Sequence, residues 1–228
     1  MMDTKFSDEL RKRMTTIKHK HFANDTIYAY LDPGDVKLIE CEVAEAFQDV
    51  LKALVINTDD DHNSKDTAHR VAKMFVHEIF RGRYYPPPDV TAFPNVKKYD
   101  QLYITGPISI DSTCAHHFQP INGKCYVGIF PGDKVIGLSK FNRVVDWIAS
   151  RPQIQEEMTE QIADMVEKET EAQGVAVVIK AEHFCMTARG VKEHESEMLT
   201  SVLRGILRDD DSLRMELFSL LNNMKGMK

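Results

Sequence analysis

The sequence has few cysteines, no long apolar run and no excess of positive charge, and each absence narrows the class of protein. Its four cysteines are too few and too scattered over 228 residues for a disulfide framework, so we expect core, metal-binding or catalytic roles for them. No apolar run is long enough to cross a bilayer, and the first residues lack the apolar stretch of a secretory signal. We therefore expect a cytoplasmic protein that does not bind a membrane.

The balance of charge points away from nucleic acid. The formal net charge is -6, which disfavours non-specific binding to a polyanion, and the basic run Arg11–Arg13 is typical of a solvated tail. With 43% hydrophobic and 28% charged residues, the chain has the composition of a globular protein with one main domain.

The spacing of apolar residues predicts an α+β fold. Residues 1–34 are polar and of mixed charge, which is typical of a flexible N-terminal arm, and we expect a helical region over 35–98 and a catalytic domain over 99–228. The expected elements are helices over about 36–56, from Asp66 or Thr67, from Ser139, from about Gln155 and over about 199–221, with strands between Tyr99 and Phe130 and over 175–187. Asn122-Gly123 is expected to form a turn between strands.

Cys114 and His117 are candidate metal ligands, because a compact turn can bring a thiolate and an imidazole three residues apart onto one ion. On a strand, His183 and Cys185 would point to the same face, so Cys185 is a candidate third ligand. Three protein ligands leave one coordination position for water, as in catalytic zinc sites. The alternatives are a buried apolar cysteine and a hydrogen-bonded core histidine.

Two further histidines, His116 and His183, lie next to these candidate ligands in the sequence. An imidazole titrates near neutral pH, so both are candidates for general acid or base.

A second set of candidates is polar and suits a phosphorylated ligand. Arg70 and Lys73 share one helical face, as do Lys140 and Arg143, and Arg189 follows the strand that contains His183. Ser139 and Lys140 lie where a helix begins, and free amides there favour phosphate oxygens. Solvated surface pairs are the common alternative.

Gln155 and Glu156 stand at another expected helix start. A carboxylate can accept two hydrogen bonds from the N1-H and 2-amino edge of guanine, whereas the alternative is a capping or solvated pair.

Taken together, these strings resemble the GTP cyclohydrolase I family. They are DTAHRVAKM at 66–74, STCAHH at 112–117, GLSKFNR at 137–143, RPQIQE at 151–156, GVAV at 174–177, HFCM at 183–186 and ARGV at 188–191. The resemblance extends from about Asp66 to the C-terminal region, in the family's order and approximate spacing.

The resemblance implies a tunnelling fold, with helices on a four-stranded antiparallel sheet and an N-terminal helical extension, in a homodecamer with active sites between subunits. It implies GTP as substrate and Zn2+ held by Cys114, His117 and Cys185. His116 and His183 would transfer protons, Ser139 would assist ribose opening, and Glu156, assisted by Gln155, would anchor guanine. The triphosphate would be held by Arg70, Lys73, Lys140, Arg143 and Arg189.

The implied reaction is hydrolytic opening of the GTP imidazole ring at C8, loss of formate and rearrangement to 7,8-dihydroneopterin triphosphate, from which folate, tetrahydropterin and deazaguanine pathways begin. One departure bears on the reaction: Ala115 stands where the family usually has glutamate. The alternative function is therefore a weakened or silent nucleotide-binding member with a regulatory role. A purely structural zinc module is a weaker alternative, because such a site would use four protein ligands.

Overall fold

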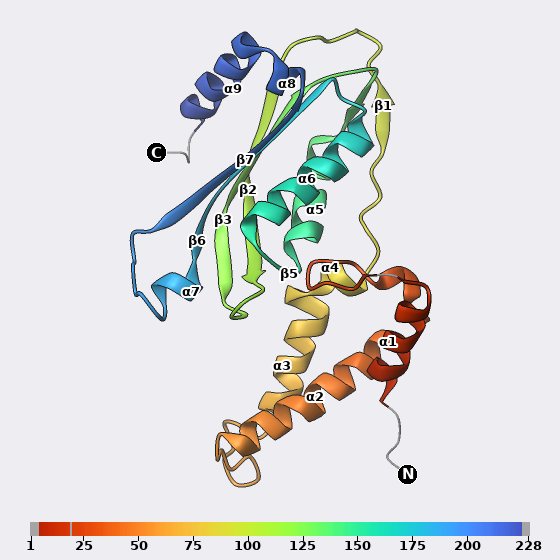
Figure 1. The fold of residues 1–228 in the computed structure, drawn as a ribbon, viewed down its shortest axis with the longest axis vertical. Helices are drawn as coiled ribbons and strands as arrows, with labels where there is room; N and C mark the ends of the chain where they lie inside the picture. The colour runs from red at the N-terminus through yellow and green to blue at the C-terminus, as the bar shows by residue number, and fades with distance from the viewer. Residues whose placement is uncertain (1–4, 19, 225–228) are drawn as a thin grey trace. The chain divides into compact units, whose positions relative to one another are not determined.

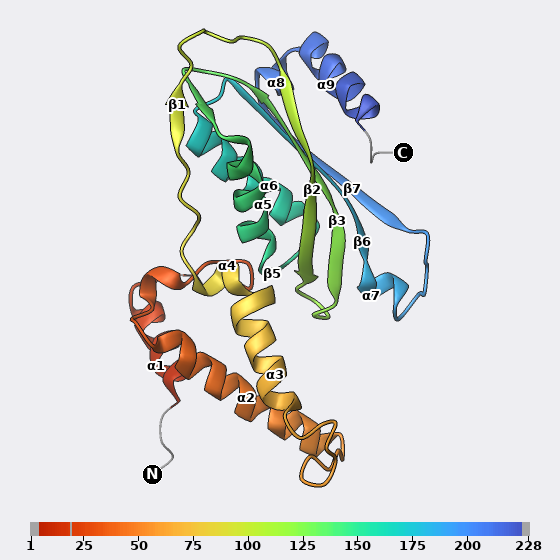
Figure 2. The ribbon, with the colours of Figure 1, turned by 180° about the vertical axis from the view of Figure 1, so that it is seen from behind.

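The computed structural model describes residues 5–18 and 20–224 and divides the chain into two compact units, one up to Pro86 and one from Pro87 (Figures 1 and 2). The two units are described separately. The regions expected over 1–34, 35–98 and 99–228 stay predictions, and residues 1–4, 19 and 225–228 lie outside the described residues.

The first unit is helical. Its elements are α1 (Phe6–Thr16), the 3-10 turn η1 (Tyr28–Tyr30), α2 (Asp35–Ala53), α3 (Thr67–Lys73), the π-helical segment η2 (Met74–Ile79) and α4 (Arg81–Tyr84). The helix expected over 36–56 corresponds to α2, and the one expected from Asp66 or Thr67 corresponds to α3. The segment expected to be an arm contains α1, whose Leu10 and Met14 are buried in a small core.

The second unit is a sheet with helices on both faces. Its elements are β1 (Ala92–Pro94), β2 (Tyr103–Cys114), β3 (Pro120–Phe130), β4 (Lys134–Ile136), α5 (Leu138–Ala149), β5 (Pro152–Gln153), α6 (Gln155–Thr170), β6 (Gly174–His183), α7 (Phe184–Thr187), β7 (Glu197–Gly205), α8 (Ile206–Asp209) and α9 (Asp211–Asn223). The mixture of helix and sheet confirms the predicted α+β class.

The main sheet has the strand order β5-β2-β3-β6-β7, and β1 pairs with β4 in a separate two-stranded sheet. β2, β3, β6 and β7 are antiparallel to their neighbours, as expected, whereas the two-residue strand β5 adds a short parallel pair with the end of β2. In both views, α5 and α6 cover one face of this sheet, and α8 and α9 lie on the other (Figures 1 and 2).

The sheet has an apolar core on each of its two faces, and this explains why β6 is hydrophobic at nearly every position. Along β6, Val175, Val177 and Ile179 enter the core beneath α5 and α6, while Ala176 and Val178 face Leu207, Leu217 and Leu221 of α8 and α9. Alternate residues of a strand face opposite sides of a sheet, so a strand buried on both sides must be apolar at every position.

Two expectations about this unit were wrong. Residues 199–205 form most of β7 rather than the start of a helix, and the helix proper, α9, begins at Asp211, where Asp210 accepts hydrogen bonds from Ser212 and Leu213. Asn122 and Gly123 lie within β3 rather than in a turn. A side chain on Gly123 would collide with the backbone of Lys180 and Ala181, so glycine at this position allows β3 and β6 to approach closely.

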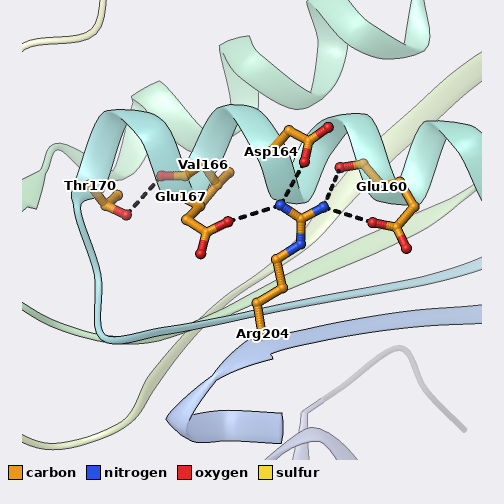
Figure 3. A network of polar contacts seen from close by, with 6 residues as sticks. All are labelled: Glu160, Asp164, Val166, Glu167, Thr170 and Arg204. Carbon is orange, nitrogen blue, oxygen red and sulfur yellow. Dashed lines mark hydrogen bonds and ion pairs between the residues drawn. The ribbon is translucent and has the colours of Figure 1, made fainter.

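Arg204 ties the edge strand β7 to α6. Its guanidinium lies 2.7 Å from Glu160, 2.6 Å from Asp164 and 2.9 Å from Glu167, all on one side of the helix (Figure 3). Burial opposes the charge of Arg204, but the hydrogen bonds that it donates to Glu160 and Glu167 outweigh this effect and raise the pKa of its side chain. The four charges therefore form one network that fixes α6 on the sheet.

None of the helices built by the described residues is long and apolar enough to span a bilayer.

Candidate active site

The candidate metal ligands gather where β2 ends. Cys114 is the last residue of β2, and its carbonyl accepts a hydrogen bond from the Phe118 amide at 2.9 Å, which closes a compact turn over residues 115–117. The Cys114 amide donates to Gln119 at 2.8 Å, and the Ala115 amide donates to Gln153 of β5 at 3.0 Å. The turn is therefore held from both sides, which places His117 back over Cys114.

Cys114, His117 and Cys185 form one cluster. Their ligand atoms all lie within 4.8 Å of one another, with Cys114 buried, Cys185 half-buried and His117 exposed. The expectation that these three residues meet is confirmed in geometry, but the reason differs from the one given by the sequence. β6 ends at His183, and Cys185 lies in the single helical turn α7 instead of continuing the strand.

The donor set fits a soft divalent ion such as zinc. Burial raises the pKa of the Cys185 thiol, and a hydrogen bond shared with the Cys114 thiol raises it further. Two thiols and one imidazole around a common point are typical zinc ligands, and a cation between them would stabilise both thiolates. Three ligands leave one position open, with the exposed side of the cluster at His117.

His116 stands beside this cluster and is exposed. Its Nδ1 lies 3.9 Å from the Cys114 sulfur, and its ring is edge-on to that of His117 at a centroid distance of 6.3 Å. The ring can therefore reach both the ligand cluster and solvent.

His183 reaches the same end of the sheet from the last position of β6. Because Ile121 pairs with His183, the start of β3 and the end of β6 are neighbours. Burial lowers the pKa of His183, and the nearby carboxylate of Glu156 opposes this effect. The neutral imidazole, which can accept a proton, is therefore favoured.

Gln155 and Glu156 are the first two residues of α6, but their side chains have different surroundings. Glu156 is exposed, whereas Gln155 is 0% exposed and its Oε1 lies 2.8 Å from His183 Nε2. The side-chain amide of Gln155 donates to carbonyls of β6 and β7, Ile179 and Met198, at 3.1 Å each.

The candidate phosphate-binding residues are spread over the chain. Arg189 is exposed just after α7, and its charge lowers the pKa of Cys185 slightly against the larger effects of burial and Cys114. Arg70 and Lys73 lie on α3 in the first unit, where Arg70 pairs with Asp66 at 3.5 Å.

Ser139, Lys140 and Arg143 lie near the start of α5, at the other end of the sheet from the metal cluster. β3 begins next to the cluster and ends at Phe130, which pairs with Gly174 at the start of β6. Shortly after Phe130 comes β4, whose Lys134 pairs with Glu171 just beyond α6, and α5 follows β4. From there α5 runs back along the sheet to Ala149, whose carbonyl accepts a hydrogen bond from Gln153 at 3.2 Å, next to Cys114. The first turn of α5, with Ser139 and Lys140, is therefore the part of the helix farthest from the cluster.

Sequence reasoning missed the buried polar residues that support the site. Gln153 is 1% exposed, and its side chain donates to Ile148 at 2.7 Å and to Ser112 at 3.2 Å, while its carbonyl holds Ala115. Thr159 and Thr200 bond to each other at 2.8 Å beside Gln155. No local pattern distinguishes these residues from exposed polar ones.

Comparison with known proteins identifies the family of this chain. The family model described as GTP cyclohydrolase I matches residues 43–222. The chain belongs to the GTP cyclohydrolase I family. A protein of Haemophilus ducreyi named GTP cyclohydrolase 1 is 41% identical to this chain over 182 residues, which cover 79% of this chain and 83% of that protein. The corresponding protein of Haemophilus influenzae shares 39% identity over 188 residues, covering 82% and 86%.

A solved structure, the archaeosine synthase QueF-Like in the apo form, shows a weak likeness with a TM-score of 0.37 and 16% identity, covering 53% of this chain and 97% of that one. The likeness is too low to establish a shared fold. Membership of the GTP cyclohydrolase I family therefore rests on the sequence matches.

Proposed function

We propose that this protein is a zinc-dependent GTP cyclohydrolase I, which opens the imidazole ring of GTP at C8, releases formate and yields 7,8-dihydroneopterin triphosphate. The observation that carries the proposal is the meeting of Cys114, His117 and Cys185 within 4.8 Å in a member of this family. Cys114, His117 and Cys185 would hold the zinc ion, which when bound supplies a nucleophile derived from water near neutral pH.

The two free histidines have different tasks in this proposal. His116 is exposed next to the ligand cluster, so it can exchange protons with both substrate and solvent. His183 is half-buried with a lowered pKa, so it suits a base that takes a proton from the substrate and returns it later.

Glu156 would select guanine. Its carboxylate is exposed at the start of α6, close enough to His183 to affect that residue's pKa. It can accept hydrogen bonds from N1-H and the 2-amino group, which adenine does not present in the same pattern. Gln155 would assist from behind, since its side chain is already buried among protein partners.

We further propose that the second unit is a tunnelling fold and that the chain acts as a homo-oligomer, a decamer by family resemblance. Ser139, Lys140 and Arg143 start α5 at the far end of the sheet from the metal cluster. A complete site therefore needs these residues from a neighbouring copy, with Arg189 from the cluster's own chain. Arg70 and Lys73 would add positive charge for the triphosphate, and Ser139 would assist opening of the ribose.

Incubating zinc-replete protein with GTP, and with ATP as the control nucleotide, tests the reaction directly. We expect formate and a pterin that becomes fluorescent on oxidation from GTP only. GTP binding without formate would refute the enzymatic proposal and favour the silent nucleotide-binding alternative.

Subunit mixing tests the shared site. His116→Ala and Arg143→Ala are each expected to be nearly inactive, but in co-expressed mixed oligomers about one site in four combines a wild-type His116 with a neighbour's wild-type Arg143. Recovery of up to about one quarter of the wild-type activity in the mixed oligomers would support active sites between subunits. Absence of recovery in oligomers proven to be mixed would contradict them.

A further inference from the structure

The side chain of Gln155 is fully buried and has hydrogen-bond partners at both ends of its amide. It is 0% exposed, and its Nε2 lies 3.1 Å from the Ile179 carbonyl, 3.1 Å from the Met198 carbonyl and 3.0 Å from Thr200 Oγ1. Backbone carbonyls only accept hydrogen bonds, so the amino end of the amide must face them. The other end, Oε1, therefore faces His183 Nε2 at 2.8 Å.

The neighbouring hydroxyl groups are consistent with this orientation of the Gln155 amide. Thr159 Oγ1 donates its one hydrogen to the main-chain carbonyl of Gln155 at 2.7 Å. In the 2.8 Å contact between the two hydroxyls, Thr200 must then be the donor. Since its hydrogen is used in this way, Thr200 cannot donate to the Gln155 side chain, whose two amide hydrogens are shared among Thr200 Oγ1 and the two carbonyls.

These directions determine the state of the histidine ring. Gln155 Oε1 is an acceptor, so Nε2 of His183 must carry a hydrogen. In a neutral imidazole one nitrogen donates and the other accepts, so the accepting nitrogen is Nδ1.

We propose that Gln155 is a positioning residue for His183, which holds the imidazole ring in place as the Nε2-H tautomer and leaves Nδ1 as its hydrogen-bond acceptor. This inference rests on the proposed function for its catalytic part. It gives Gln155 a task at the imidazole rather than direct contact with guanine, in keeping with a side chain that has no exposed surface.

The tautomer can be measured without catalysis. Solid-state 15N NMR of protein labelled at histidine, with the His183 signals identified by their loss in His183→Gln, should show a protonated Nε2 and an unprotonated Nδ1 in the neutral ring. A wild-type ring protonated at Nδ1 would overturn the proposal, whatever the variants do.

Gln155→Met removes the acceptor and keeps the length of the side chain. We expect it to lose the single tautomer and to release formate about 10- to 100-fold more slowly in single turnover, with GTP affinity within about threefold of wild type. Thr159→Val is the matched control, because it breaks the same buried network but leaves Gln155 Oε1 in place. It should keep the Nε2-H tautomer and most of the rate.

Equal loss of rate and of tautomer in both variants would show that the network is merely structural and would overturn the assignment. If Gln155→Met does not fold, the wild-type tautomer and the Thr159→Val rate still decide. If the wild-type protein has the Nε2-H tautomer and binds GTP but releases no formate, the proposed function is refuted, and Gln155 then has no catalytic effect to explain. The positioning of His183 by Gln155 would still hold in that case.

Discussion

Replacing Arg204 with methionine tests how the helix that begins with Gln155 and Glu156 is held on the sheet. Arg204 is 21% exposed, whereas its partners Glu160, Asp164 and Glu167 are 58%, 65% and 45% exposed (Figure 3). Because water screens the carboxylates, each pair is assigned about 0.5 kcal/mol, from the middle of the range for exposed ion pairs.

Glu160 and Asp164 are four residues apart, and Asp164 and Glu167 are three apart, so these carboxylates repel one another along one face of α6. This repulsion exists with and without Arg204 and does not add to the difference. The three lost pairs give an expected loss of about 1.5 kcal/mol in the free energy of unfolding. Arg204→Lys keeps the charge but not the fork of donors, so it should lose less.

Urea denaturation at one fixed protein concentration measures this loss, at about 0.05 M and about 1 M salt, because screening acts over about 14 Å in the first case and about 3 Å in the second. The deficit of Arg204→Met should shrink by more than half at high salt. Arg208→Met is the matched control, because Arg208 is 67% exposed and pairs only with its neighbour Asp209 among the ion pairs described, and it should change stability by less than about 0.5 kcal/mol. A deficit that is independent of salt, or equal in both variants, would refute the reasoning.

Three further predictions concern the site. Cys185→Ala should lose most of its bound zinc while keeping its secondary structure, as measured by elemental analysis and circular dichroism; undiminished zinc would remove Cys185 from the ligand set. His116→Ala should keep zinc and GTP affinity but lose about 10²–10⁴ in single-turnover formate release, and wild-type turnover would refute its role. Glu156→Gln should weaken GTP binding and reduce the preference for GTP over ATP with metal content intact, and unchanged preference would contradict guanine recognition.

The helices and central strands could be predicted from the sequence because each has a periodic apolar pattern. Ile39 and Leu51 are buried on α2, and Met158 and Ile162 are buried on α6, as an amphipathic helix requires. β6 was recognisable for the opposite reason, since it is apolar on both faces.

The edge strands could not be predicted in the same way. In β7, exposed and half-buried residues alternate only as far as Val202, and the half-buried run that follows contains Arg204, whose charge is paired with three carboxylates of α6. β5 has two residues, which is too few for any periodicity. Both strands are determined by neighbours distant in the sequence.

The same limit applies to the site. Cys114, His117 and Cys185 could be predicted as candidate ligands because thiol and imidazole side chains are the groups that zinc prefers. Only Cys114 and His117 are close in the sequence, and the meeting with Cys185 depends on the end of β6 and on α7. The position of Ser139, Lys140 and Arg143 could not, because it depends on α5 starting at the opposite end of the sheet. Spacing along a chain does not show at which end of a sheet a helix begins.

The chemistry of this site is exposed, but its geometry is determined by buried amides. His116, His117 and Glu156 are exposed, and none of them could hold a fixed position by packing alone. Two glutamines at the end of the sheet supply the missing constraint. The main-chain carbonyl of Gln153 holds the turn that contains both histidines, while its side chain holds β5 against Ser112 and Ile148. The Gln155 side chain holds His183. Each is almost fully buried, so a change there is expected to alter the reaction through residues that it leaves chemically intact.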